Sequence, residues 1–136
     1  MDLKSQISVE YMLIIGFVAV MIVPLIILYY TYTTNSKDEI ISSQVNQLAK
    51  RIVDAAESVY FLGEPSQTTL RIYIPNRIMG ASLDNKEVVF NMSTRSGISQ
   101  IVQVSSVDLI GKLPKGQGVY SLTLNATDAG VKISYK

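Results

Sequence analysis

An uncharged run from Tyr11 to Ser36 constrains the fold of this chain more than any other feature. Its residues are almost all apolar as far as Tyr32. A bilayer core about 30 Å thick is crossed by about 20 helical residues, because each residue advances about 1.5 Å along the helix axis. The run therefore predicts a membrane-spanning helix. Tyr29, Tyr30 and Tyr32 at its end are typical of aromatic side chains at a membrane surface.

The composition limits the classes of function that the chain can have. Its 136 residues include no cysteine and no histidine, which removes disulfides, thiolate chemistry, imidazole bases and the usual zinc ligands. The formal net charge is only +1, and both signs are mixed after the apolar run, so we expect no nucleic-acid partner. The sequence shows no catalytic constellation. We therefore expect no enzyme, no cofactor and no metal, and one small domain after the run.

A short polar segment precedes the apolar run. Residues 1–5 contain one lysine, Lys4, and Gln6, Ser8 and Glu10 follow at alternate positions. A conventional secretory signal has an apolar region of about 7 to 15 residues and a small-x-small cleavage site, whereas this run is longer and no such site follows it before Thr31. The apolar segment is therefore expected to stay in the mature protein, with any cleavage in front of it.

These residues carry a family resemblance. The segment Lys4-Ser5-Gln6-Ile7-Ser8-Val9-Glu10-Tyr11-Met12-Leu13 resembles the class III signal peptide of archaeal type IV pilin-like proteins. In that family a basic and a small residue precede Gln-x-Ser-x-Glu, and a membrane-embedded prepilin peptidase cuts before the glutamine. The resemblance implies cleavage between Ser5 and Gln6, with Lys4, Gln6, Ser8 and Glu10 in the recognition motif.

The same resemblance implies a set of partners and a location. The subunit would be held in the membrane before assembly and then packed with copies of itself into a helical, extracellular filament. Its other partners would be the prepilin peptidase and a pilus assembly platform in the membrane. The matching residues are confined to the N-terminal segment and the start of the apolar run.

Cleavage at that position would place a positive amine on Gln6, one helical turn from Glu10. A carboxylate beside hydrocarbon is costly unless it is paired, so the amine of the same subunit or of a neighbour is its expected partner. A simpler interpretation places Glu10 in the first helical turn, where it favours the helix dipole, with Ser8 as a cap. The sequence alone is compatible with both interpretations of Glu10.

Three small or special residues interrupt the apolar run. Gly16 and Ala19 are spaced i, i+3, which allows a neighbouring helix to approach closely. Pro24 removes one backbone donor and crowds the carbonyl of Val20, which predicts a kink or a local opening. We count Gly16 and Pro24, together with Gln6 and Glu10, as candidate assembly residues.

A second helical pattern follows, from about Lys37 to Phe61. It has one apolar stripe, Ile41, Val45, Leu48, Ile52, Ala55 and Val59. Charged residues lie off the stripe at Lys37, Asp38, Lys50, Asp54 and Glu57. The stripe is expected to pack on the protein's own sheet, and a coiled coil between subunits is the alternative. Gly63 and Pro65 predict the end of a long, nearly continuous helix.

From Thr68 the apolar residues alternate with a period of two. Strands are predicted over 70–74, 79–83, 87–92, 98–104, 119–124 and 131–135, separated by turn residues, which is typical of an antiparallel meander. The loop from Gly111 to Gly118 is rich in glycine and lysine but lacks P-loop spacing, so we expect an exposed linker. Asn91-Met92-Ser93 and Asn125-Ala126-Thr127 are candidate N-glycosylation sites beside predicted turns.

The sequence thus predicts an α+β fold, with a long N-terminal apolar helix, extended by an amphipathic helix, on a compact antiparallel sheet domain. The expected organisation is a leader (1–5), an apolar helix (6–36) and an amphipathic helix with a β head (37–136). The expected function is that of a structural subunit of an archaeal type IV pilus-like filament used in surface adhesion. The alternatives are a single-span, membrane-anchored cell-surface binding protein and a minor pilin that regulates assembly.

Overall fold

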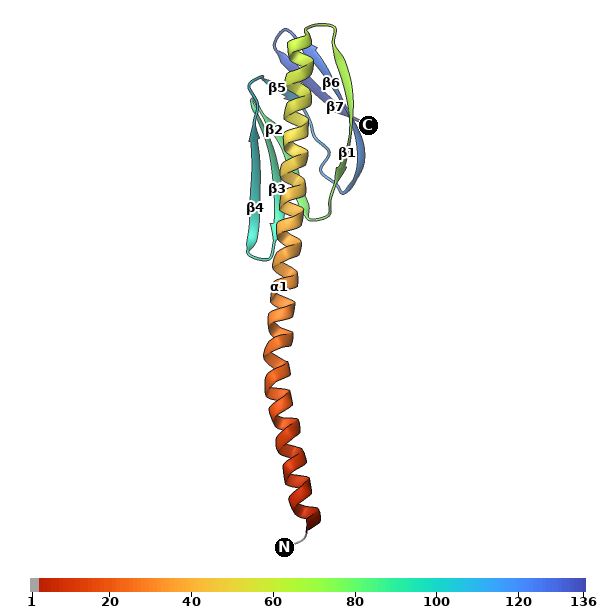
Figure 1. Cartoon of the computed structure of the whole chain (residues 1–136). Coiled ribbons are helices and arrows are strands. Elements are labelled where there is room, and N and C mark those ends of the chain that lie inside the picture. The colour runs from red at the N-terminus through yellow and green to blue at the C-terminus, as the bar shows by residue number, and fades with distance from the viewer. Residues whose placement is uncertain (1–2) are drawn as a thin grey trace. The chain divides into compact units, whose positions relative to one another are not determined.

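The computed structural model describes the backbone of residues 3–136, and side chains of residues 8–33 and 36–136. The chain forms two compact units, Met1–Lys37 and Asp38–Lys136. Helix α1 (Leu3–Leu62) runs from the first unit into the second, and seven strands follow it (Figure 1). An α+β fold with a long N-terminal apolar helix followed by antiparallel sheets confirms the predicted fold class.

Helix α1 is regular over its whole length. It continues through Pro24, so the local opening predicted there is absent, and no turn interrupts it near Ser36. It ends where the sequence predicts, because Gly63 has a φ of +76° and its N–H donates to the carbonyl of Tyr60 at 3.0 Å. A residue with a Cβ adopts that conformation only at a cost, which explains the glycine.

The strands of the second unit form two sheets. One sheet has the order β1-β6-β7-β5, and the other has the order β2-β3-β4. The strands are β1 (Gln67–Ile74), β2 (Ile78–Asp84), β3 (Glu87–Thr94), β4 (Gly97–Val104), β5 (Leu109–Gly111), β6 (Gly118–Thr127) and β7 (Gly130–Tyr135).

The predicted meander is correct for β2, β3 and β4 and for the antiparallel hairpin of β6 and β7, but the order of the larger sheet differs from it. Strand β1 pairs with β6 rather than with β2, and the short β5, which sequence analysis missed, pairs parallel to β7. Turn signals report which strands are joined by tight turns. They do not indicate which sheet each strand joins. The chain leaves the larger sheet after β1 and returns to it at β5, and this arrangement depends on how the two sheets pack on the helix.

The apolar stripe of α1 packs against both sheets and forms the core of the second unit (Figure 1). Val45 and Ile52 are fully buried, and Phe90 of β3 and Leu122 of β6 lie in the same cluster. The predicted stripe is therefore confirmed as an intrachain contact, so these side chains are not available for a coiled coil. The buried face is wider than predicted, since it includes the smaller Ala49, Val53 and Ala56.

Polar contacts join the flank of the helix to the sheets. The carboxylate of Asp38 pairs with Arg77 and accepts a hydrogen bond from the N–H of Arg95 at 3.2 Å. One oxygen of Glu57 accepts hydrogen bonds from the N–H and the hydroxyl of Ser106, both at 2.8 Å. Asp38 and Glu57 are thus half-buried contact residues, although the sequence pattern placed them on the solvated face.

Candidate functional site

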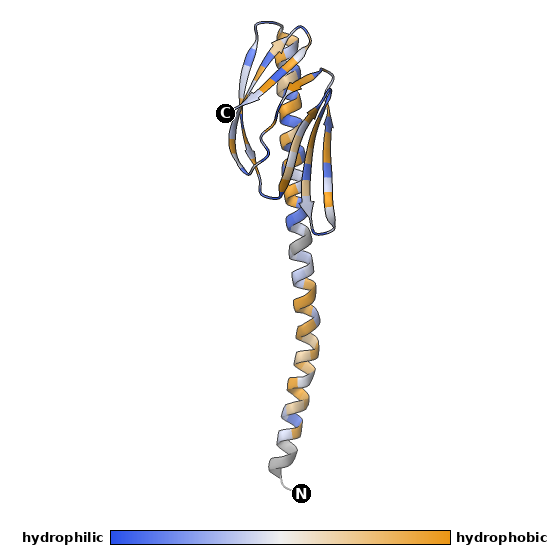
Figure 2. Ribbon diagram, turned by 180° about the vertical axis from the view of Figure 1, so that it is seen from behind, coloured by the Kyte–Doolittle hydropathy of each residue, from blue (hydrophilic) through white to orange (hydrophobic). Residues whose placement is uncertain are grey.

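The first unit presents an apolar surface that nothing in its own fold covers. From Val9 to Tyr32 the large apolar and aromatic side chains of α1 are all between 46% and 78% exposed. Figure 2 shows this concentration of hydrophobic residues on the helical turns of the first unit. From Ser8 onward the helix is long and apolar enough to cross a membrane. A surface of this kind has to be covered by lipid or by other apolar surfaces.

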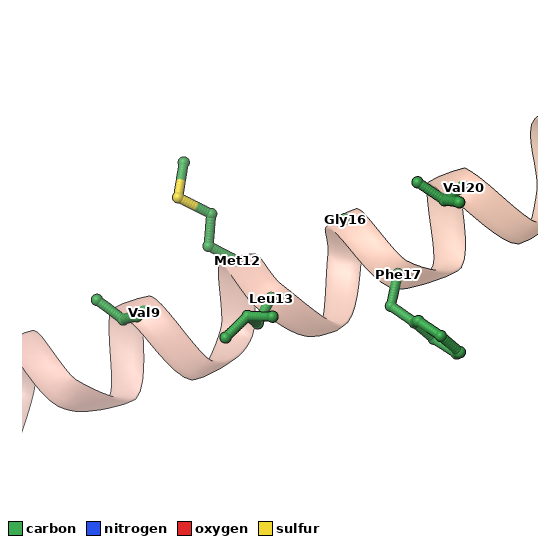
Figure 3. A pocket seen from close by; sticks show the side chains of 6 residues that line it. All are labelled: Val9, Met12, Leu13, Gly16, Phe17 and Val20. Atoms are coloured by element: carbon green, nitrogen blue, oxygen red, sulfur yellow. The ribbon is translucent and has the colours of Figure 1, made fainter.

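A groove of about 530 Å³ centres on Gly16. Met12 and Val20 extend on one side of the ribbon and Phe17 on another, so Gly16 leaves the backbone bare between them (Figure 3). A Cβ added at Gly16 would meet no atom within 4 Å. The glycine is therefore not needed for packing inside the unit, and its effect is to let another surface come close to the helix.

Ala19 lies three residues after Gly16 and is therefore its neighbour on the helix surface. It lines a second groove, with Tyr11, Ile15 and Ile22 among its neighbours. The two small residues thus line two different grooves. Apolar grooves on two faces suit a helix that is surrounded, rather than one that has a single partner on one side.

Polar side chains at the end of the apolar segment are satisfied by the helix itself. The hydroxyl of Thr31 donates to the carbonyl of Ile27 at 2.9 Å, and that of Ser36 donates to the carbonyl of Tyr32 at 3.0 Å. Such bonds lower the cost of placing a hydroxyl in apolar surroundings. Tyr29 and Tyr30 contact each other edge to face, with 6.2 Å between ring centroids, and both rings are exposed, as is that of Tyr32.

The predicted recognition motif lies in part outside the described side chains. Lys4, Ser5 and Gln6 belong to the helical backbone, but their side chains are not among those described, so the cleavage site stays a prediction. Ser8 and Glu10 are exposed. Helix α1 begins at Leu3 while residues 1–5 are attached, so a capping role for Ser8 and a first-turn role for Glu10 would arise only after cleavage before Gln6, and they stay a prediction.

The two sequons lie in the last residues of β3 and β6, next to the turns that follow these strands. Asn91 is half-buried in β3, the central strand of its sheet, and Asn125 is half-buried in β6, between β1 and β7. The side-chain oxygen of Asn125 is buried, without a hydrogen-bond partner among the described residues. The strands extend further than predicted, to Thr94 and Thr127, so the asparagines belong to strands while the sequons stay beside the turns. Use of the sequons stays a prediction.

The loop after β5 also differs from its prediction. Lys112 and Lys115 are exposed as expected, but Leu113 and Pro114 between them are buried, so the segment is anchored in the core rather than a free linker. The two lysines line a cavity with β2 and Tyr135. Sequence reasoning missed this site. The only signal for it was the Leu-Pro pair between the lysines, which indicates a fixed segment but not what it faces.

Within the described residues, no group of histidine, cysteine, aspartate and glutamate has a geometry that would hold a metal ion. The long N-terminal apolar helix and the antiparallel sheet packed on it form a type IV pilin-like architecture. Comparisons with known proteins give no match, whether with protein-family models, with curated proteins or with solved structures.

Proposed function

We propose that this chain is a structural subunit of an archaeal type IV pilus-like extracellular filament that acts in surface adhesion. A prepilin peptidase would release it between Ser5 and Gln6, and an assembly platform in the membrane would add it to copies of itself. The observation that carries the proposal is the uncovered apolar surface from Val9 to Tyr32, which precedes a head with its own buried core.

The size of this surface explains why it needs a cover. Full burial of one large apolar side chain contributes about 1.5 to 3 kcal/mol. About twenty such side chains would therefore supply tens of kcal/mol when lipid or other helices cover the segment. The grooves on two faces allow several neighbouring helices to make that contact.

Glu10 favours the filament over a simple membrane anchor. Its side chain is exposed and lies between Val9 and Tyr11, at the edge of the apolar surface. In a filament, the new amine of Gln6 on an incoming subunit would pair with Glu10 of a subunit already in place. Apolar contact would supply most of the affinity, and this charge pair would fix the axial register.

Processing is tested by sequencing the N-terminus of the protein from cell membranes and from purified surface material. The mature chain is expected to begin at Gln6, because the basic-small-glutamine junction precedes an apolar helix that stays attached. A start at Met1, or one beyond Thr31, would contradict the resemblance to class III signals and most of the argument for a filament.

The role of Glu10 is tested by Glu10→Ala beside Glu39→Ala, which removes an exposed carboxylate from the second unit. Breaking a buried charge pair costs about 3 to 5 kcal/mol per contact. Glu10→Ala is therefore expected to be cleaved and inserted normally but to yield few or no filaments by electron microscopy, while Glu39→Ala assembles like the wild type. Filaments in wild-type amounts from Glu10→Ala would sink the register argument.

The alternative of a single-span binding protein predicts a different result from the same material. A helix that stays in lipid keeps Glu10 near the interface, where water and headgroups solvate it, so Glu10→Ala would be nearly silent. Electron microscopy with peptide mass mapping of surface material distinguishes the two, because only the filament places this chain in isolated fibres. A minor pilin would appear in fibres that consist mainly of another protein.

A further inference from the structure

A cavity of about 400 Å³ lies in the second unit, where the two sheets meet. Its walls come from β2, from the end of β5 with the loop after it, and from the end of β7. The lining combines the hydroxyl-bearing Ser82, the apolar Leu83, the cations Lys112 and Lys115, and the ring of Tyr135. Small-molecule sites in proteins are commonly about 300 to 1,000 Å³ and combine apolar walls with a few polar groups.

The segment that carries the lysines is fixed in place. Leu113 is 2% exposed and Pro114 is fully buried, so the residues on both sides of this pair are held at the cavity. Gly111 has a φ of +135°, and a Cβ there would lie 2.0 Å from the carbonyl oxygen of Ile133. Strand β5 therefore lies against β7 more closely than any residue with a side chain allows.

The aromatic wall is fixed as well. Tyr135 packs edge to face on Tyr120, with 6.0 Å between ring centroids and 85° between ring planes. A Cβ added at Gly118 would lie 3.3 Å from the Tyr120 ring, so the chain after the lysine loop runs close against that ring. Tyr135 is itself 47% exposed, which leaves part of its ring free to meet a ligand. A ring held in this way loses little side-chain entropy on binding.

The charged residues that line the cavity are of one sign. They are Lys112 and Lys115, and no acidic residue is among the lining residues. Two cations without a lining carboxylate favour an anionic ligand.

We propose that this cavity binds a sugar that carries a carboxylate, such as a uronic acid unit of an acidic polysaccharide. The two lysines would hold the carboxylate, Ser82 would hydrogen-bond a ring hydroxyl, and the exposed part of Tyr135 would contact the apolar face of the sugar ring. A simple inorganic anion satisfies the lysines but leaves the apolar wall and most of the volume unused. The site belongs to the head alone, so it does not depend on whether the chain polymerises.

The test uses the full chain in detergent micelles, where binding is measured without filaments. The probes are oligogalacturonate, a neutral maltooligosaccharide of the same length, and inorganic phosphate. Calorimetry is expected to show saturable binding of oligogalacturonate, and no binding of the neutral oligosaccharide at the same concentration. Phosphate at equal concentration is expected not to displace the oligogalacturonate.

The variants test the role of each wall. The double variant Lys112→Gln, Lys115→Gln is expected to weaken binding at least about tenfold, which corresponds to about 1.4 kcal/mol of binding free energy. Tyr135→Leu is expected to weaken it about fivefold, while Tyr135→Phe, which keeps the ring, binds like the wild type. The matched control is Lys132→Gln, since Lys132 is an exposed cation in β7 that does not line the cavity.

Four results would each overturn the proposal: no binding of oligogalacturonate at millimolar concentration, equal binding of the neutral sugar, full displacement by equimolar phosphate, or an equal loss in Lys132→Gln. Thermal unfolding of each variant shows whether the head is folded. A variant that does not fold is replaced by the single change Lys115→Gln. Failure here would leave the filament proposal intact, because neither Gln6 nor Glu10 enters the experiment.

Discussion

The two halves of α1 place their apolar side chains differently, although both are regular helix. From Val9 to Tyr32 the large apolar side chains are all exposed, whereas from Val45 to Val59 they lie on one face and are buried against the sheets. An apolar stripe with polar residues on the other face can be satisfied by one chain. A helix that is apolar on every face must be surrounded by lipid or by several neighbouring helices. The second half of α1 is therefore covered by its own chain, whereas the first half needs other molecules to cover it.

The largest expected effect comes from removing the apolar half. A fragment of residues 38–136 keeps the whole buried cluster and loses about twenty exposed apolar side chains. We expect it to be a folded monomer in water without detergent, while the full chain associates or requires detergent. Size-exclusion chromatography with light scattering measures this difference. A fragment that forms stable oligomers would show that the head also presents an assembly surface.

A pair of leucine substitutions compares the halves directly. Leu48 is 7% exposed in the core and Leu25 is 63% exposed on the apolar surface. Leu48→Ala is expected to lower the free energy of unfolding of the head by about 2 to 5 kcal/mol, because it leaves a cavity. Leu25→Ala should change it by less than about 0.5 kcal/mol.

Both variants are measured by denaturant unfolding of the full chain in the same detergent. A similar loss in the two would mean that the apolar half contributes to the stability of the head, and the division between the halves would fail. A negligible loss in Leu48→Ala would mean that the stripe is packed more loosely than its burial indicates.

A smaller effect is expected at the boundary between the halves. Asp38 contacts Arg77 and the N–H of Arg95, which lie near the β1–β2 and β3–β4 turns. These contacts are partly exposed, so Asp38→Asn should cost no more than about 1 kcal/mol, and the cost should shrink at high salt. Unfolding at low and high ionic strength checks this. A loss that does not depend on salt would indicate that packing at this position matters more than charge.

A feature of the fold could be predicted from the sequence where it is determined by residues that are close together in the chain. The helix, its end at Gly63 and the alternating strands follow from periodicity and from residue conformations that act over a few positions, and the structure confirms them. The pairing of β1 with β6 and the buried Leu113 and Pro114 depend on contacts between distant segments. No local pattern encodes those contacts, which is why the lysine loop looked like a free linker.

The polar contacts of the helix are the hardest to predict. Asp38 and Glu57 have the spacing of a solvated face, and their partners Arg77 and Ser106 lie in connecting segments far along the chain. The candidate assembly residues could be singled out in the sequence for the opposite reason, and their role in assembly stays a prediction. Gly16 and Glu10 stand out because the segment around them is uniformly apolar, so any exception is visible in the sequence alone.

The smallest expected effect is a pH dependence at the packed end of the helix. Hydrogen bonds from the backbone N–H and the hydroxyl of Ser106 lower the pKa of the Glu57 carboxyl below its ordinary value of 4.5, against a smaller opposing effect of burial. Because the folded-state pKa is the lower one, the ionised carboxylate stabilises the fold above the unfolded-state pKa. This contribution is lost as the pH falls from the unfolded-state pKa through the folded-state pKa.

Glu57→Gln should therefore remove an acid-sensitive contribution that solvent screening keeps below about 1 kcal/mol. As the pH falls from about 6.5 through the folded-state pKa of Glu57, the wild type is expected to lose more stability than Glu57→Gln, and the two curves should converge below that pKa. Glu64→Gln, which neutralises an exposed carboxylate beyond the helix end, controls for the change in net charge. If Glu64→Gln flattens the profile as much as Glu57→Gln does, the acid sensitivity reflects net charge rather than the bond to Ser106. The two hydrogen bonds would then orient the loop after β4 without stabilising the packed half of α1.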